Sequence, residues 1–136
     1  MLKKLGLVNL HVALKKKIER NTGLQAFDYV PENAPAPFYS IEIVDKRAEN
    51  TKTMWCETFT VWIHAIAEEQ HSRLGIYNLI ESLEEALTEE IVLPEHVTLL
   101  NQNNVGVQSL QKDETNEMHA VLAYEFKVCY GFRVKN

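Results

Sequence analysis

The stretch that decides the fold is Met118–Phe132, with the sequence MHAVLAYEFKVCYGF. Its large apolar residues recur at every second position, whereas His119, Glu125 and Lys127 stand between them. A period of two, with many aromatic and β-branched residues, is typical of a strand that buries one face. The polar segment Asp113–Asn116 comes just before this strand and predicts a hairpin tip. The end of the chain is therefore predicted to close a sheet.

Earlier segments predict three more strands. Tyr39–Val44 and Trp55–Ile66 both alternate apolar with other residues, and the polar segment Asp45–Thr53 separates them. A less regular strand is predicted from Val97 to Leu110, because the polar run Asn101–Asn104 interrupts its alternation. These strands and the last one predict a sheet of about four mostly antiparallel strands.

Two segments have the period of a helix. In Leu2–Arg20 the apolar residues form a wide stripe, and Asn21–Gly23 is a plausible stop. The second helix is predicted to begin after Ser72 as its N-cap and to bury apolar residues at helical spacing. These residues are Ile76, Leu79, Ile80, Leu83 and Leu87. Between the first helix and the first strand, Leu24–Val30 has no clear pattern, and the prolines that follow predict a loop.

The order helix, strand, strand, helix, strand, strand predicts an α+β fold with both helices packed on one face of the sheet. A length of 136 residues fits one domain better than two, so residues 1–136 are expected to form a single domain.

Composition excludes several classes of function. The chain has 14 basic and 19 acidic residues, a net charge of −5, which does not favour sequence-specific binding to nucleic acid or binding to anionic lipid. No apolar run approaches the roughly 18 to 20 residues that cross a membrane. The N-terminal segment lacks the cleavage site of a signal peptide. We therefore expect a soluble protein made in the cytoplasm.

Motifs of catalysis and cofactor binding are not found in the sequence. The five glycines are scattered, so no phosphate-binding loop can be assembled. Cys56 and Cys129 lack the spacing of a redox or zinc motif, and we expect them to be reduced and to pack inertly. The alternative is a nucleophilic cysteine activated by His64 or His119. If residues 64–71 formed one continuous helix, His64 and Glu68 would share a face and His71 would lie near it, an arrangement that could bind a metal.

The strand pattern instead places His64 on a strand, where a histidine satisfied by a hydrogen bond is expected. We accordingly predict no catalytic residue, no metal and no cofactor.

Charge is distributed unevenly along the chain. Residues 1–20 hold six basic residues against one acidic residue, a net charge of +5. Residues 68–90 hold seven acidic residues against one basic residue, a net charge of −6. The two predicted helices thus carry opposite signs. Either these are solvated faces or an intramolecular attraction, or the basic surface of one copy meets the acidic surface of the next, a contact that closes into a ring when the rotation permits.

The pattern resembles the tail-completion, or tail-to-head joining, proteins of long-tailed bacteriophages and prophages. The features that carry this resemblance are a proline-bearing approach to the first strand (Ala34–Ile41), a tryptophan-containing strand (Phe59–His64) and the helix that follows. The resemblance covers nearly the whole chain. It implies a non-enzymatic virion protein that caps the head-proximal end of the tail tube as a homo-oligomeric ring, expected to be a hexamer. Its expected partners are further copies, the tail-tube protein and the head–tail connector protein.

Interface candidates follow from the charged helices and from the two polar projections of the predicted sheet. They are Lys15, Lys16, Lys17, Arg20, Glu81, Glu84 and Glu85 on the helices, Lys46, Arg47, Glu49 and Lys52 in the first projection, and Lys112, Asp113 and Glu114 at the hairpin tip. Both projections could equally be solvated turns. Two other functions stay open, namely a monomeric binding module, such as another neck component or a cytosolic adaptor, and a small enzyme.

Overall fold

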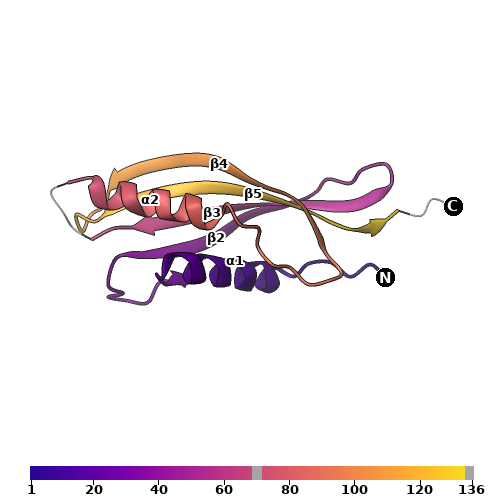
Figure 1. The fold of residues 1–136 in the computed structure, drawn as a ribbon, viewed down its shortest axis with the longest axis horizontal. Coiled ribbons are helices and arrows are strands. Elements are labelled where there is room, and N and C mark those ends of the chain that lie inside the picture. The colour runs from indigo at the N-terminus through magenta and orange to yellow at the C-terminus, as the bar shows by residue number, and fades with distance from the viewer. Residues whose placement is uncertain (69–71, 134–136) are drawn as a thin grey trace.

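The computed structural model describes residues 1–68 and 72–133, and in them the chain forms two helices and five strands (Figure 1). The elements are α1 (Leu7–Thr22), β1 (Ala26–Phe27), β2 (Phe38–Ala48), β3 (Met54–Ile66), α2 (Leu74–Ala86), β4 (Thr98–Lys112) and β5 (Met118–Phe132).

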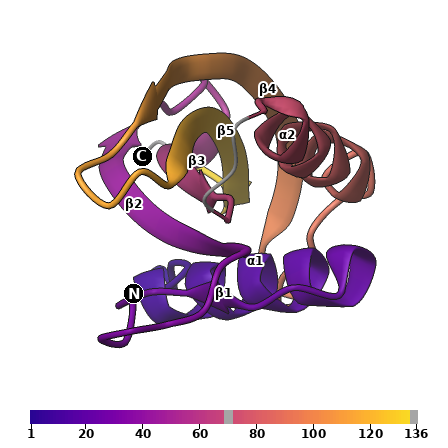
Figure 2. The same cartoon turned by 90° about the vertical axis from the view of Figure 1, so that its left-hand side faces the viewer.

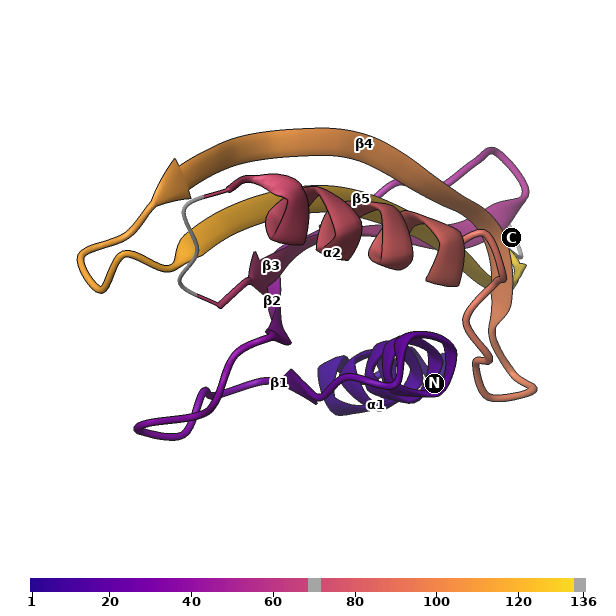
Figure 3. The same ribbon diagram turned by 60° about the vertical axis from the view of Figure 1, so that its left-hand side comes forward.

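The five strands form one sheet in the order β1-β2-β3-β5-β4. All neighbouring strands are antiparallel except β1 and β2. The sheet arches over both helices, which lie on its inner face (Figure 3). The α+β class and the packing of helices on one face are confirmed, whereas the prediction of about four strands is wrong by one.

The additional strand is β1, in the segment for which the sequence has no clear pattern. Tyr39 donates its backbone N–H to the carbonyl of Gln25, which begins the pairing with β2. Two side chains of α1 bind Ala26 of β1. The Lys15 ammonium donates to the Ala26 carbonyl at 2.7 Å, and the Glu19 carboxylate accepts the backbone N–H of Ala26 at 3.0 Å. A strand of two residues is too short to show a period, so tertiary contacts specify it.

The other strand limits differ from the prediction in two places. β2 continues to Ala48 through a bulge between Ile43 and Asp45, so Asp45–Ala48 is strand rather than loop. β4 is continuous from Thr98 to Lys112, because three bulges absorb the irregular positions that interrupt its alternation. β3 and β5 match the predicted segments closely.

The first helix begins later than predicted, and its end lies close to the predicted stop. α1 starts at Leu7 rather than Leu2 and ends at Thr22, followed by Gly23, whose φ of 75° is the left-handed conformation that glycine adopts readily. α2 begins one residue later than Ser72 would place it as N-cap, with Arg73 in that position. Ser72 still caps the chain locally, because its Oγ accepts the N–H of Leu74 at 3.2 Å.

The core lies between the helices and the inner face of the sheet. Side chains of α1 and α2 meet alternate residues of β2, β3 and β5, as in Leu14, Ile76 and Phe59, which are fully buried. Figure 2 shows the molecule end-on, with α1 below and α2 beside the curved sheet. The opposite, outer face of the sheet is more exposed and includes Trp62 on β3.

The cysteines are not reduced. Cys56 on β3 and Cys129 on β5 are joined by a disulfide, because the antiparallel pairing places them opposite one another with Cα atoms 4.1 Å apart. The prediction of two inert, separately packed thiols is therefore wrong. The register that brings together residues 73 positions apart is a property of the folded sheet.

Candidate interaction surfaces

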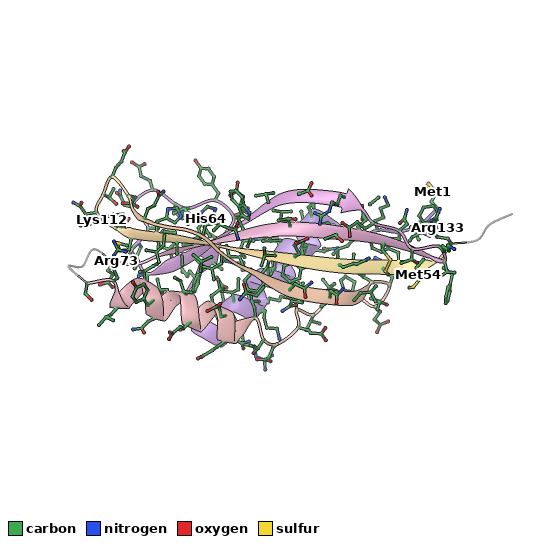
Figure 4. The ribbon with its side chains drawn as sticks, turned by 90° about the horizontal axis from the view of Figure 1, so that it is seen from above. Met1, Met54, His64, Arg73, Lys112 and Arg133 are labelled. Carbon is green, nitrogen blue, oxygen red and sulfur yellow. A yellow bond between two sulfur atoms is a disulfide. The ribbon has the colours of Figure 1, made fainter. Side chains whose placement is uncertain are left out.

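The molecule is elongated, and its two projecting hairpins lie at opposite ends. In Figure 4, Met54, Arg133 and Met1 lie at one end, and Lys112 and Arg73 lie at the other. The first end is formed by the turn between β2 and β3, and the second by the turn between β4 and β5. The two polar segments predicted as contacts therefore lie at opposite ends of the molecule.

Arg47 is the centre of an ion-pair network near the first end. It donates to Glu125 at 2.7 Å, to Asp45 at 2.8 Å and to Glu49 at 2.7 Å. These hydrogen bonds, the one to Glu125 first, raise the pKa of the guanidinium. Hydrogen bonds from Thr58 and Arg47 lower the pKa of the Glu49 carboxyl. Arg47 and Glu49, both predicted contacts, are thus engaged within the chain and brace three strands.

A buried carboxylate, that of Glu57, lies on the inner face of β3 at the same end. Tyr130 donates to it at 2.7 Å, and the ammonium groups of Lys4 and Lys46 lie 3.7 and 3.9 Å away. Lys46 also lies over the ring of Phe59, 6.0 Å from its centroid. Lys46 therefore compensates a buried charge, whereas Lys52, in the turn, is exposed.

Large apolar side chains gather at this first end, and the sequence pattern alone did not predict a surface there. Phe132 is 78% exposed, and Trp55 on β3 is exposed beneath the guanidinium of Arg133, 4.8 Å from the ring centroid. Met1 and Leu2 are exposed as well. Trp55 and Phe132 lie at the ends of β3 and β5, whereas Met1 and Leu2 precede α1. Clustered exposed apolar groups are typical of protein-binding surfaces.

The opposite hairpin tip is built by Asp113. Its carboxylate accepts hydrogen bonds from the backbone N–H groups of Thr115 and Glu117 and from the Thr115 hydroxyl. These bonds, with that of the Thr115 hydroxyl first, lower the pKa of Asp113. Lys112 and Glu114 are exposed beside it. Asp113 therefore shapes the turn, and its two neighbours are available for contacts.

The basic helix uses two of its four predicted contact residues internally. Lys15 pairs with Glu19 at 2.8 Å and lies over Phe27, which fastens β1 to the helix. Lys17 is buried and pairs with Glu89, beyond α2, at 3.6 Å. The intramolecular attraction between the oppositely charged segments is therefore real, and among the described residues it involves one ion pair.

The remaining helix charges point outward. Lys16, Arg20, Glu81 and Glu85 are exposed and form no ion pair within residues 1–68 and 72–133. Glu84 is half-buried and accepts a hydrogen bond from Asn104 of β4 at 2.9 Å. The free charges are thus concentrated on the outward sides of α1 and α2.

His64 lies on β3, as predicted, and its hydrogen bonds are satisfied. Its Nδ1 is 2.8 Å from Nε2 of His119 on β5, and its Nε2 is 2.9 Å from a carboxylate oxygen of Glu42 on β2. Of the suggested metal site with Glu68 and His71, His71 lies outside the described residues. The nucleophilic alternative is contradicted, because Cys56 and Cys129 are both in the disulfide and neither is a free thiol.

The described part of the chain contains no group of three or more histidine, cysteine or carboxylate side chains placed to hold a metal ion. Among the described residues, no helix is long and apolar enough to cross a membrane.

The hollows on the surface are shallow grooves. One, of about 300 Å³, lies between the C-terminal ends of α1 and α2, and another of about 280 Å³ runs beside α1 and Val92. The arrangement is suited to contacts with other proteins.

Comparison with known proteins decides the family. A family model described as a putative tail termination protein, phage tail terminator 4, matches residues 1–136. The chain belongs to this family of tail terminators. The fold agrees: a chain in the solved virion of a native gene transfer agent particle has a TM-score of 0.73 and 16% identity, covering 90% of this chain and 96% of that one. No curated protein sequence matches the chain. Membership of a tail-terminator family implies a structural protein of the phage tail.

Proposed function

We propose that this tail terminator caps the head-proximal end of the phage tail tube and joins it to the head connector as a homo-oligomeric ring of six copies. The observation that carries the proposal is the family match over the entire chain. The ring, its copy number and its partners go beyond that match, and the features of the surface support them. The protein would act in the virion, after synthesis in the host bacterial cytoplasm, without a cofactor and without catalysis.

The shape of the subunit supports a position between two layers. Its turn 49–53 and its turn 113–117 lie at opposite ends of the long axis, so one can contact the tail-tube protein while the other contacts the connector (Figure 1). The first end also carries Trp55 and Phe132, whose exposure fits a permanent protein contact. The net charge of −5 argues against nucleic acid as the main partner.

The alternative of a monomeric binding module depends on an exposed strand edge. β4 is the last strand of the sheet and carries exposed Val105 and Val107. However, its three bulges break the regular row of backbone groups that an added strand needs, a common way of protecting an edge. The edge of β4 is therefore poorly suited to bind a strand of a partner, which argues against this alternative.

The proposal is tested with purified tail tubes that lack their terminator. We expect the protein to bind one end of each tube, visible by electron microscopy with a labelled chain, and to stop further addition of tube subunits. Lys52→Glu with Phe132→Ser perturbs the first end, and Lys112→Glu with Glu114→Lys perturbs the second. One pair should abolish tube binding and the other connector binding. The proposal would be contradicted if the tubes carried no labelled chain and grew at the same rate with and without the protein.

A further inference from the structure

The outward side of α1 carries an ordered stripe of four residues. Val8, Val12, Lys16 and Arg20 recur at intervals of four, and all are exposed, Val8 to 74%. The stripe begins apolar and ends basic. With a rise of about 1.5 Å per residue it is about 18 Å long.

The outward side of α2 carries a stripe of the same order and opposite charge. Leu74, Tyr77, Glu81 and Glu85 follow at intervals of three and four, and all are exposed, Leu74 to 67%. The stripe begins apolar and ends acidic, and its length is about 17 Å at the same rise. Like the α1 stripe, it has no charged partner within the described residues.

We propose that the α1 stripe of one copy binds the α2 stripe of a second copy, with the two helices parallel. In this direction the apolar pair Val8 and Val12 meets Leu74 and Tyr77, and the basic pair meets the acidic pair. An antiparallel alignment would instead place valines against glutamates. Matching length, order and charge identify another copy of this chain as the occupant of both stripes.

The surroundings of the α1 stripe provide a place for an aromatic side chain. A groove of about 280 Å³ beside α1 is lined by Val12, Lys16 and Val92, and Val92 is itself 77% exposed. Tyr77 is the exposed aromatic residue of the α2 stripe. Its ring fits between Val12 and Val92, while its hydroxyl stays at the rim, an arrangement common among anchoring residues of interfaces.

Within one chain the two stripes form no ion pair with each other among the described residues, although α1 and α2 pack against one another and Glu85 lines the groove between their C-terminal ends. α1 also packs on β1 and β2, whereas α2 also packs on β3 and β5 (Figure 2). Each copy therefore presents one basic and one acidic stripe, and a repeated head-to-tail contact generates a closed ring or an open filament. That the repeated contact closes into a ring rests on the proposed function. The inference adds which surfaces of neighbouring copies form that contact.

Charge reversal tests the interface in the full chain. The variants are Lys16→Glu with Arg20→Glu (the acidic variant), Glu81→Lys with Glu85→Lys (the basic variant), and all four changes together. Glu32→Lys with Glu95→Lys is the matched control, because both residues are exposed and it changes the net charge as the basic variant does. Self-association is measured by sedimentation velocity over a range of concentrations, alone and on tail tubes, after melting curves confirm folding.

We expect the acidic and basic variants each to associate about tenfold more weakly than the wild type, since two exposed attractions become repulsions. An equimolar mixture of the two should associate again, with alternating copies. The fourfold variant should recover most of the wild-type association, and the control should equal the wild type. Tyr77→Ser should weaken association, and Tyr77→Phe should retain it.

Three results would overturn the inference. Acidic and basic variants that associate like the wild type would show that the ring uses another surface. A fourfold variant weaker than either double variant would show that these charges do not face one another. In both cases, wild-type rings that still cap tubes would leave the proposed function intact. A wild type that stays monomeric alone and on tubes would overturn the inference and the proposed ring together.

Discussion

Two buried tyrosines offer a matched test of how polar groups contribute to this core. Tyr39 on β2 and Tyr124 on β5 are 0% and 2% exposed. The Tyr39 hydroxyl donates to the carbonyl of Leu79 in α2 at 2.7 Å, whereas the Tyr124 hydroxyl has no hydrogen-bond partner among the described residues. Burial raises the pKa of both, that of Tyr124 to about 12, so both are neutral at pH 7. Replacing each by phenylalanine removes the same atom from two different environments.

The two substitutions should differ in their effect on stability. Tyr39→Phe removes a buried hydrogen bond between sheet and helix and should lower the free energy of unfolding by about 1 to 1.5 kcal/mol. Tyr124→Phe removes a hydroxyl that was desolvated without compensation, so stability should be unchanged or rise by up to about 1 kcal/mol. The expected difference between the two variants is therefore about 1 to 2.5 kcal/mol.

Urea denaturation followed by circular dichroism measures both values. Equal denaturant slopes in the wild type and both variants would show that the midpoints report stability alone. If Tyr124→Phe were as destabilising as Tyr39→Phe, the reasoning would be refuted, because the Tyr124 hydroxyl would then have a stabilising partner. A neutral Tyr39→Phe would equally show that its hydrogen bond to Leu79 is not formed in solution.

Three further predictions concern pH and the disulfide. Asp113→Ala should lower the free energy of unfolding by about 1 kcal/mol at pH 7, because it removes the hydrogen bonds of the hairpin tip. The pKa of Asp113 is lowered in the folded state, so the difference from the wild type should shrink as pH falls below about 4. Urea titrations at several pH values measure this difference. Burial and the neighbouring His64 lower the pKa of His119, so the unfolded chain binds more protons and stability should fall as pH drops below about 6.5; His119→Gln should reduce this slope, with Glu42 and Asp113 left in place. Reduction of the Cys56–Cys129 disulfide should lower the free energy of unfolding by about 2 to 4 kcal/mol, measured with and without a phosphine reductant, and a Cys56→Ser/Cys129→Ser variant should match the reduced protein.

Most of the fold was predicted from segments with a regular hydrophobic period. The predictions were wrong where the period is absent or irregular. β5 and α2 were predicted because a long segment repeats one period and buries one face. β1 was missed because two residues have no period, and its pairing depends on Lys15 and Glu19 from the preceding helix. In β4 the bulges shift the alternation, so a continuous strand resembles an interrupted one.

The candidate site could be predicted only in part, because residue type alone does not show which charges are already paired. Arg47 and Lys52 are both basic residues of the same projection, but Arg47 holds three carboxylates of the chain and Lys52 is exposed. The disulfide depends in the same way on strand register, which brings Cys56 to Cys129. Pairing across the sheet is a tertiary property and leaves no local signal.

The sides of α1 make different contacts, and for this reason its exposed residues are the informative ones to mutate. One side of the helix packs into the core through Leu10 and Leu14, and a flank fastens β1 through Lys15. Substitutions on either side would weaken folding and association together, and the two effects could not be separated. Lys16 contributes to neither side, because it is exposed and has no ion pair among the described residues. Reversing it should therefore leave stability within about 0.5 kcal/mol of the wild type, so that a loss of assembly reports the contact between copies.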